Sequence, residues 1–220
     1  MNHDAEKTDY AERVDALAEK LARHLSPESW RSLFYGADIS TIRVDRKEQT
    51  VLYAEAPASV VIDARARRSF AAELEWLAVR YGGRVEHFHQ SAGVAYFEDP
   101  VACVRMAADL QRSAGALHLR MGLYTGMCDI GTFCSDCEIH STLIGDETRK
   151  AAQVAATAAS GSIAISPETY AHVRDEIHSE ASRCLVMEEF LESDLAQVCL
   201  TPAPAPGGEH AMSTFAGLGH

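Results

Sequence analysis

The stretch GGRVEHFHQSAGVAYF, residues 82–97, carries the strongest fold signal in the chain. Two glycines open it, and two segments rich in apolar and aromatic residues follow, around Arg84 to His89 and around Gly93 to Phe97. Only a few polar residues separate these two segments. Strand-like segments that lie so close together are typical of a β-hairpin, so we expect two antiparallel strands here.

Helical patterns flank the predicted hairpin on both sides. Apolar residues recur at helical spacing from Asp63 to Tyr81 before it and from Pro100 to Ser113 after it. Strands at residues 50–54, 118–124 and 162–166, a cysteine-bearing loop after the second of these, and helices at residues 146–159 and from Pro167 onward complete the prediction. Strands that alternate with helices and include a hairpin indicate an α+β fold, with helices packed on a mixed sheet.

An apolar stripe runs along the N-terminal segment. Its members are spaced four, three, four and four residues apart, with charged residues between them, and they are Tyr10, Val14, Leu17, Leu21 and Leu25. This spacing places them on one face of a helix, which we interpret as an interaction surface. The alternative is that a stripe this short packs on its own domain, because it spans too few heptads to define a coiled coil.

Composition restricts the kind of partner. The chain of 220 residues has a net charge of −12, which argues against nucleic acid or an anionic membrane surface as a partner. No apolar run is long enough to cross a bilayer, and the polar start lacks the apolar region of a signal peptide, so we expect a cytoplasmic protein. Its six cysteines are then expected to be mostly free thiols.

Four blocks of the sequence together resemble the class III adenylate/guanylate cyclase family, of which this chain looks like a degenerate member. They occur in the order of the family and cover roughly residues 26–180. The blocks are LSPESWRSLF (25–34), RKEQTVLYAEAPAS (46–59), the hairpin stretch 82–97, and LRMGLYTGMCDIG (119–131) through GDETRKAAQVAATAASGSIAISPETY (145–170).

This resemblance implies a ferredoxin-like core and a head-to-tail dimer with active sites at the interface. It divides the chain into an N-terminal helix with a short linker helix (1–48), a nucleotidyl cyclase homology domain (49–185) and a C-terminal extension (186–220) that we expect to be disordered after about residue 200. The N-terminal helix would set a dimer with a second copy or with another cyclase domain. ATP or GTP would be the substrate of an active member, and Mg²⁺ or Mn²⁺ its metal.

The resemblance also places the two metal-binding carboxylates of the family. The first aligns with Glu55, which keeps a carboxylate but is one methylene longer than aspartate. The second aligns with Ser91, which has no negative charge for a divalent cation. Two-metal catalysis needs both, so we expect the metal site to be broken.

In paired cyclases, one half supplies base, ribose and transition-state contacts instead. The two base-reading positions of such a half align with His87 and Thr142, the ribose position with Arg149 and the transition-state arginine with Gln153. Of these only the Thr142 hydroxyl suits its role, because it can still read a purine edge. Neutral Gln153 cannot offset charge on a transferring phosphoryl group as a guanidinium does. The alternative interpretation is that these positions only pack or solvate a former cleft.

Other groups offer weaker metal sites. Asp38, Asp45 and Asp63 are spare carboxylates outside the family's metal positions. Cys128, Cys134, Cys137 and His140 follow the pattern C-x5-C-x2-C-x2-H, which can hold zinc or part of an iron–sulfur centre, although it contains only one close cysteine pair. The alternative is that these cysteines are free thiols in a surface loop.

Three hypotheses follow. The first is a non-catalytic cyclase homology domain that dimerises or binds a nucleotide or a protein. The second is an active adenylate/guanylate cyclase, a phosphorus–oxygen lyase, with an altered metal site built on Glu55. The third is a redox or metal sensor on the cysteine loop.

Overall fold

The computed structural model describes residues 12–20, 43–57, 62–135, 138–180, 185–190 and 197–202, without the side chains of 134, 135, 138, 176–180 and of the last two segments. The described strands form one sheet of eight strands in the order β2-β3-β1-β4-β6-β8-β7, and β5 pairs with β4 beside this path. Most neighbours are antiparallel, whereas β4 and β6 are parallel. The sheet is therefore mixed, as predicted.

The predicted hairpin is present and lies beside the central strand β1 (Arg43–Glu55). Its strands are β2 (Arg84–His89) and β3 (Ala92–Phe97), and β3 pairs antiparallel with β1. β1 is much longer than the predicted strand at residues 50–54. Its first half is mostly charged and lacks a strand-like apolar pattern, but it pairs with β4.

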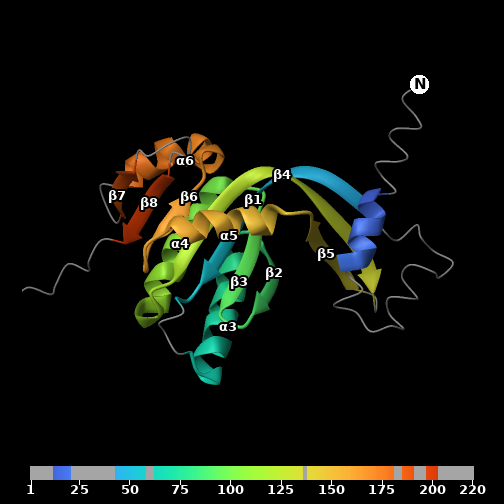
Figure 1. Cartoon of the computed structure of the whole chain (residues 1–220), viewed down its shortest axis with the longest axis horizontal. Coiled ribbons are helices and arrows are strands. Elements are labelled where there is room, and N and C mark those ends of the chain that lie inside the picture. The colour runs from blue at the N-terminus through green and yellow to red at the C-terminus, as the bar shows by residue number, and fades with distance from the viewer. Residues whose placement is uncertain are drawn as a thin grey trace, which may run out of the picture.

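The segment predicted as a cysteine-bearing loop is a strand, which corrects the sequence analysis. β4 (Arg120–Ser135) continues through it and pairs with β5 (Glu138–Ile144). We call the paired residues 129–135 and 138–144 the arm. Figure 1 shows the arm extending away from the rest of the sheet, with helix 12–20 beside it. Glycines in β4 weaken the strand pattern, while the ladders to β1 and β5 supply the missing stability.

Three helices pack on one face of the sheet: α3 (Ala64–Arg80), α4 (Pro100–Ala114) and α6 (Pro167–Glu180). Leu52 and Ala54 point from β1 into this larger core. The short η2 (Gly115–Leu117) follows α4, and β6 (Ile163–Ile165) precedes α6.

Helix α5 (Glu147–Thr157) lies on the opposite face, where Ala151 packs with Val51 and Val94 in a smaller core. It approaches β4 so closely that a Cβ at Gly122 would lie 2.1 Å from the backbone nitrogen of Ala155. The contact therefore requires glycine at this position. The helices predicted around residues 63–81, 100–113 and 146–159 are thus all present.

The sheet extends beyond the boundaries predicted for the homology domain. β7 (Leu185–Phe190) and β8 (Gln197–Pro202) pair with each other, and β8 also pairs with β6. These strands fall in the segment assigned to the C-terminal extension. The linker-helix segment and residues 203–220 lie outside the described residues. No helix in the described part of the chain is both long and apolar enough to span a membrane.

Candidate functional site

The two predicted metal positions lie side by side at one end of β1. Glu55 faces Ala92 in the antiparallel register of β1 and β3. The backbone N–H of Ala56 donates a hydrogen bond of 3.0 Å to the carbonyl oxygen of Ser91. The fold therefore brings Glu55 and the hairpin turn with Ser91 together, as the resemblance implies.

A cation of the chain itself neutralises Glu55. Arg120 begins β4 directly opposite Glu55, and its Nη2 lies 2.5 Å from Glu55 Oε1. The Tyr53 hydroxyl donates a hydrogen bond of 3.2 Å to Glu55 Oε2. Burial, followed by the nearby Glu55 carboxylate, raises the pKa of Tyr53, so this phenol remains a donor at neutral pH. Each oxygen of the Glu55 carboxylate thus has a partner from the same sheet.

The residues at this end of β1 do not fit a pair of divalent cations. Such a site needs several charged oxygen ligands. Of the two predicted metal positions, Glu55 carries a carboxylate that is already paired with Arg120, and Ser91 is neutral. No group of three or more His, Cys, Asp or Glu residues suited to a metal occurs among the described residues. Asp45 pairs with Arg43 at 2.8 Å.

The two other spare carboxylates add no ligand here. Asp63 is the N-cap of α3, where its side chain accepts a hydrogen bond from the Ala66 N–H. Asp38 lies outside the described residues. Sequence reasoning found Glu55 and Ser91 and missed Arg120, because its position opposite Glu55 depends on the pairing of distant strands.

Thr142, the predicted base-reading residue, belongs to a hydrogen-bonded cluster in the arm. Its hydroxyl donates a 2.6 Å hydrogen bond to Glu86 Oε1, and the backbone N–H of Leu143 donates a 3.0 Å bond to Glu86 Oε2. Lys20 Nζ, from helix 12–20, lies 2.5 Å from Glu86 Oε1. The Glu86 side chain is only 2% exposed, so these contacts replace its hydration.

Sequence reasoning missed Glu86, although it directly precedes the predicted His87 in β2. The one sequence signal for Glu86 was a carboxylate inside a predicted strand. Buried acidic side chains are rarely left without a partner, so this position indicated a paired carboxylate. His87 itself is exposed. The structure thus connects Thr142 to β2 through Glu86, at the position next to His87.

Helix α5 carries the two remaining predicted positions on its exposed side. Arg149 pairs with Asp146 at 2.6 Å, and Lys150 pairs with the same carboxylate at 3.1 Å. The hydrogen bond from Lys150 is the main reason why the pKa of Asp146 is lowered. Arg149 and Lys150 thus form ion pairs with Asp146 on the surface of the helix. Gln153 is also exposed.

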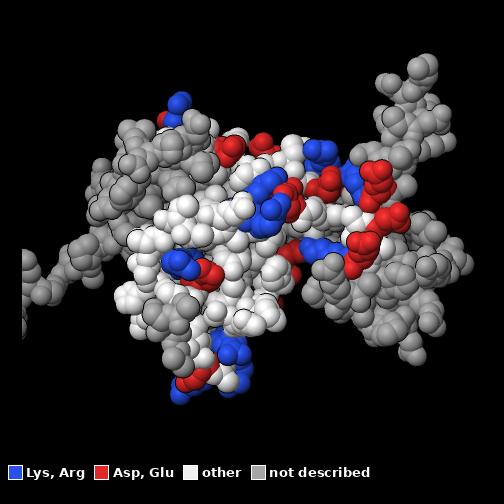
Figure 2. Space-filling view, viewed as in Figure 1, with Lys and Arg blue, Asp and Glu red and all other residues white. Residues whose placement is uncertain are grey.

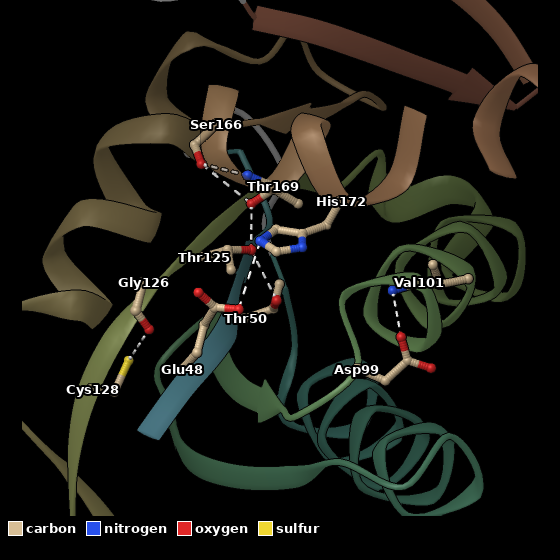
Figure 3. Close-up of polar contacts among 10 residues, drawn as sticks. All are labelled: Glu48, Thr50, Asp99, Val101, Thr125, Gly126, Cys128, Ser166, Thr169 and His172. Atoms are coloured by element: carbon tan, nitrogen blue, oxygen red, sulfur yellow. Dashed lines mark hydrogen bonds and ion pairs between the residues drawn. The ribbon is translucent and has the colours of Figure 1, made fainter. Parts of the chain in front are cut away.

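Among the described members of the cysteine pattern, Cys128 lies in β4 and His140 in β5. Cys128 is fully buried, and burial raises its pKa to about 12, so it is a thiol rather than a thiolate at neutral pH. Its Sγ donates to the Gly126 carbonyl at 3.4 Å (Figure 3). His140 stacks on Phe133 with ring centroids 5.4 Å apart. The side chains of Cys134 and Cys137 lie outside the described residues, so the metal-binding interpretation remains a prediction.

A chain of hydroxyl groups connects the middle of the sheet to α6. Thr50 and Thr125 lie 2.9 Å apart, Thr125 and Thr169 also 2.9 Å, and Thr169 lies 3.2 Å from Ser166 (Figure 3). All four hydroxyls are buried, so this chain satisfies polar groups between β1, β4 and α6. It fixes the strands that carry Glu55 and Arg120.

A polar groove of about 350 Å³ lies between β1, the hairpin and the arm. Arg84 and Ser141 line it and are hydrogen-bonded to each other at 3.0 Å. Burial raises the pKa of Tyr96, another lining residue, against the effect of Arg84 and Ser141. Gln49 also lines the groove, and its side-chain amide is buried without a hydrogen-bond partner. The groove is thus polar, but the negative charges of its carboxylates equal the positive charges of its Lys and Arg side chains.

No protein-family model and no curated protein sequence matches the chain. Among solved structures, the adenylyl cyclase CyaB from P. aeruginosa aligns with a TM-score of 0.55 at 22% identity, over 72% of this chain and 95% of that one. A dimeric guanylyl cyclase domain, that of the RhoGC fusion protein from the fungus Blastocladiella emersonii, aligns with a TM-score of 0.59 at 16% identity, over 73% and 97%.

A third similar structure is the guanylate cyclase domain of RhGC from Catenaria anguillulae in complex with GTP. Its TM-score is 0.54 at 19% identity, and the alignment covers 72% of this chain and 98% of that domain. At these identities the likeness concerns the fold, and the alignments include almost the whole of each cyclase domain. The chain therefore has the α+β fold of class III adenylyl and guanylyl cyclase catalytic domains.

Proposed function

We propose that the chain is a cyclase homology domain that makes no cyclic nucleotide and acts by binding a nucleotide or a protein partner. The observation that carries this proposal is the Glu55–Arg120 pair. In this pair, Arg120 of β4 supplies a positive charge to the first predicted metal position, Glu55. The second predicted metal position, Ser91, is adjacent and neutral.

Cyclisation of a nucleoside triphosphate needs an activated ribose hydroxyl and a neutralised triphosphate. Divalent cations provide both by acting as Lewis acids. A guanidinium only donates hydrogen bonds and cannot act as a Lewis acid, so Arg120 supplies charge only. Since Gln153 is neutral, the transition-state position adds no compensating charge.

Binding of a partner is the function left to the retained fold. One similar guanylyl cyclase domain is described as dimeric, and another was solved with GTP. We accordingly propose that this chain forms a homodimer or a heterodimer with another cyclase domain, with ATP or GTP as a possible ligand near His87 and Thr142. The chain's net charge of −12 favours a protein or small molecule over nucleic acid.

The experiment measures nucleotide binding, metal binding and product formation in the same samples. ATP and GTP, each with Mg²⁺ or Mn²⁺, are titrated into the purified wild-type chain by calorimetry, and cyclic product is then assayed. We expect no cyclic nucleotide. Metal-dependent product that disappears in Glu55→Gln would instead establish the alternative, an active cyclase with an altered metal site.

A gain-of-binding variant sharpens this test. The double substitution Ser91→Asp and Arg120→Gln places a second carboxylate at the hairpin turn and removes the competing cation. We expect Mn²⁺ binding in this variant and none at this position in the wild type. Equal Mn²⁺ affinity in both would show that Arg120 does not exclude the metal. Zinc and iron analysis of anaerobically purified protein tests the cysteine-sensor hypothesis separately.

A further inference from the structure

Helix 12–20 presents two chemically different sides. Arg13, Leu17 and Lys20 are spaced four and three residues apart and so form one stripe. Leu17 is fully buried, and Arg13 and Lys20 are partly buried. The opposite side of the helix is acidic, with Glu12, Asp15 and Glu19 all exposed. Figure 2 shows acidic side chains gathered over this helix.

The surface under this helix is complementary to its basic stripe. We call it the arm face and define it by Glu86, Asp129, Gly131 and Leu143. Arg13 lies 2.8 Å from Asp129, and Lys20 lies 2.5 Å from Glu86 and also donates to the Leu143 carbonyl oxygen. Rotating the helix would bring its acidic side against these carboxylates, so the charges select one orientation.

Leu17 fits a space that only glycine leaves open. A Cβ at Gly131 would lie 2.7 Å from both methyl carbons of Leu17 and 3.2 Å from its Cγ. Such distances are too short for ordinary contact, so even alanine at position 131 would displace the leucine. The helix and the arm face are thus complementary in shape as well as in charge.

We propose that the arm face is a receptor for the chain's own helix 12–20, which acts as a releasable latch over the Glu86–Thr142 pair. Lys20 lies on the same Glu86 oxygen that accepts the Thr142 hydroxyl, and it completes the burial of that carboxylate. With the helix seated, Thr142 and Glu86 are satisfied by each other and by Lys20. With the helix released, Glu86 regains water, which then competes with the Thr142 hydroxyl for the same carboxylate oxygen.

The consequence for a ligand rests on the proposed function, whereas the docking itself does not. If a nucleotide or a second cyclase domain takes the Thr142 hydroxyl as its hydrogen-bond partner, release of the helix favours that exchange because it weakens the contact between Thr142 and Glu86. The partner chemistry that fits the arm face is a helix with a basic stripe around a leucine. The observed occupant is the same chain, because Arg13, Leu17 and Lys20 all contact it in one molecule.

A disulfide trap tests whether the helix docks within one chain. In Leu17→Cys/Gly131→Cys, the leucine Cγ lies 3.2 Å from the Cβ position at 131, and its Cβ is one bond further along, which suits the Cβ separation of about 3.5–4.5 Å in disulfides. We expect a cross-link within monomers after mild oxidation, identified by peptide mapping. The control Asp15→Cys/Gly131→Cys has the same number of cysteines, with one on the exposed side of the helix.

Two results of this trap would overturn the proposal. A cross-link that joins two chains would mean that the arm face receives the helix of a second copy. Cross-linking no faster than in the Asp15 control would mean that the helix does not dock at all.

Hydrogen exchange tests the release without any change on the arm. The Leu143 amide donates to Glu86, so its protection depends on the ordered carboxylate. We expect Lys20→Ala to accelerate exchange of the Leu143 amide by about tenfold and Glu19→Ala, on the exposed side, to leave it unchanged. Identical exchange in both variants would overturn the latch.

The two proposals fail in different ways. Absence of nucleotide binding in the wild type and in Lys20→Ala would remove the nucleotide ligand from the proposed function, while the cross-link and exchange results would still establish the latch. Loss of the cross-link together with normal nucleotide binding would remove the latch and leave the proposed function unaffected.

Discussion

Two carboxylates, Glu55 at the end of β1 and Glu86 in the hairpin, are each paired with a cation of the same chain at 2.5 Å. Their surroundings differ. The Glu55 side chain is 24% exposed and receives Arg120 from the neighbouring strand. The Glu86 side chain is 2% exposed and receives Lys20 from a helix far away in the sequence. One pair is thus built into the sheet, and the other joins two separate elements.

This difference determines which pair can open. Arg120 is fixed opposite Glu55 by the β1–β4 register, so its charge stays at the metal position as long as the sheet is intact. Lys20 leaves Glu86 when a short helix detaches, which requires no change in the sheet. The first pair is thus a fixed part of the sheet, whereas the second, which joins two elements, is the one suited to regulation.

Glu86→Ala should have the largest effect on stability. It leaves the Thr142 hydroxyl and the Leu143 N–H without their acceptor and removes the partner of Lys20. We expect a loss of about 2–3 kcal/mol in the free energy of unfolding, because buried donors lose their acceptor. Urea denaturation measures it. The control Glu98→Ala removes a 76% exposed carboxylate from the end of the same hairpin and should cost under about 0.5 kcal/mol.

Arg120→Met should cost less, about 1 kcal/mol, because Glu55 can recover part of its hydration. Combining it with Glu55→Gln removes the unpaired charge. A double-mutant cycle measured by denaturation should therefore give a coupling energy of no more than about 1 kcal/mol. A coupling as large as the effect of Glu86→Ala would contradict the distinction between the open and the buried pair.

Glu147 offers a test by pH. Burial raises the pKa of Glu147 above its usual value of 4.5, so the folded state holds this proton more tightly than the unfolded state. Protonated Glu147 therefore favours the folded state. This contribution to the free energy of unfolding is full below the pKa of the unfolded state and is lost as the pH rises through the pKa of the folded state. We expect Glu147→Gln to become increasingly more stable than the wild type as the pH rises above the usual Glu pKa of 4.5. Thermal unfolding across this range measures the gain, and a difference that shrinks with rising pH would contradict the assignment.

Asp146→Asn should have the smallest effect. Its ion pairs with Arg149 and Lys150 lie on the exposed side of α5, where water and salt screen them. We expect a loss of about 0.3–0.5 kcal/mol at low ionic strength that vanishes near 1 M salt. The effect of Glu86→Ala should persist at high salt, because that pair is buried. Equal salt sensitivity of the two variants would remove the contrast.

Much of the fold was predictable because its signals are local. The hairpin at 84–97 and the helices α3, α4 and α5 follow from apolar spacing and stop residues that act over a few positions. The segment after Tyr124 was predicted as a loop, and Gly126 and Gly131 do interrupt its strand pattern. Pairing with β1 and β5 outweighs this local preference, since strand stability depends on tertiary context.

The sequence by itself determined the fold class and, through the family resemblance, predicted that neutral Ser91 stands at the second metal position. The tertiary structure alone decided which cations pair with Glu55 and Glu86. Arg120 meets Glu55 through strand register, and Lys20 meets Glu86 through the docking of a helix. Charges act through space, so two residues 66 positions apart in the sequence reveal their attraction only after the chain has folded.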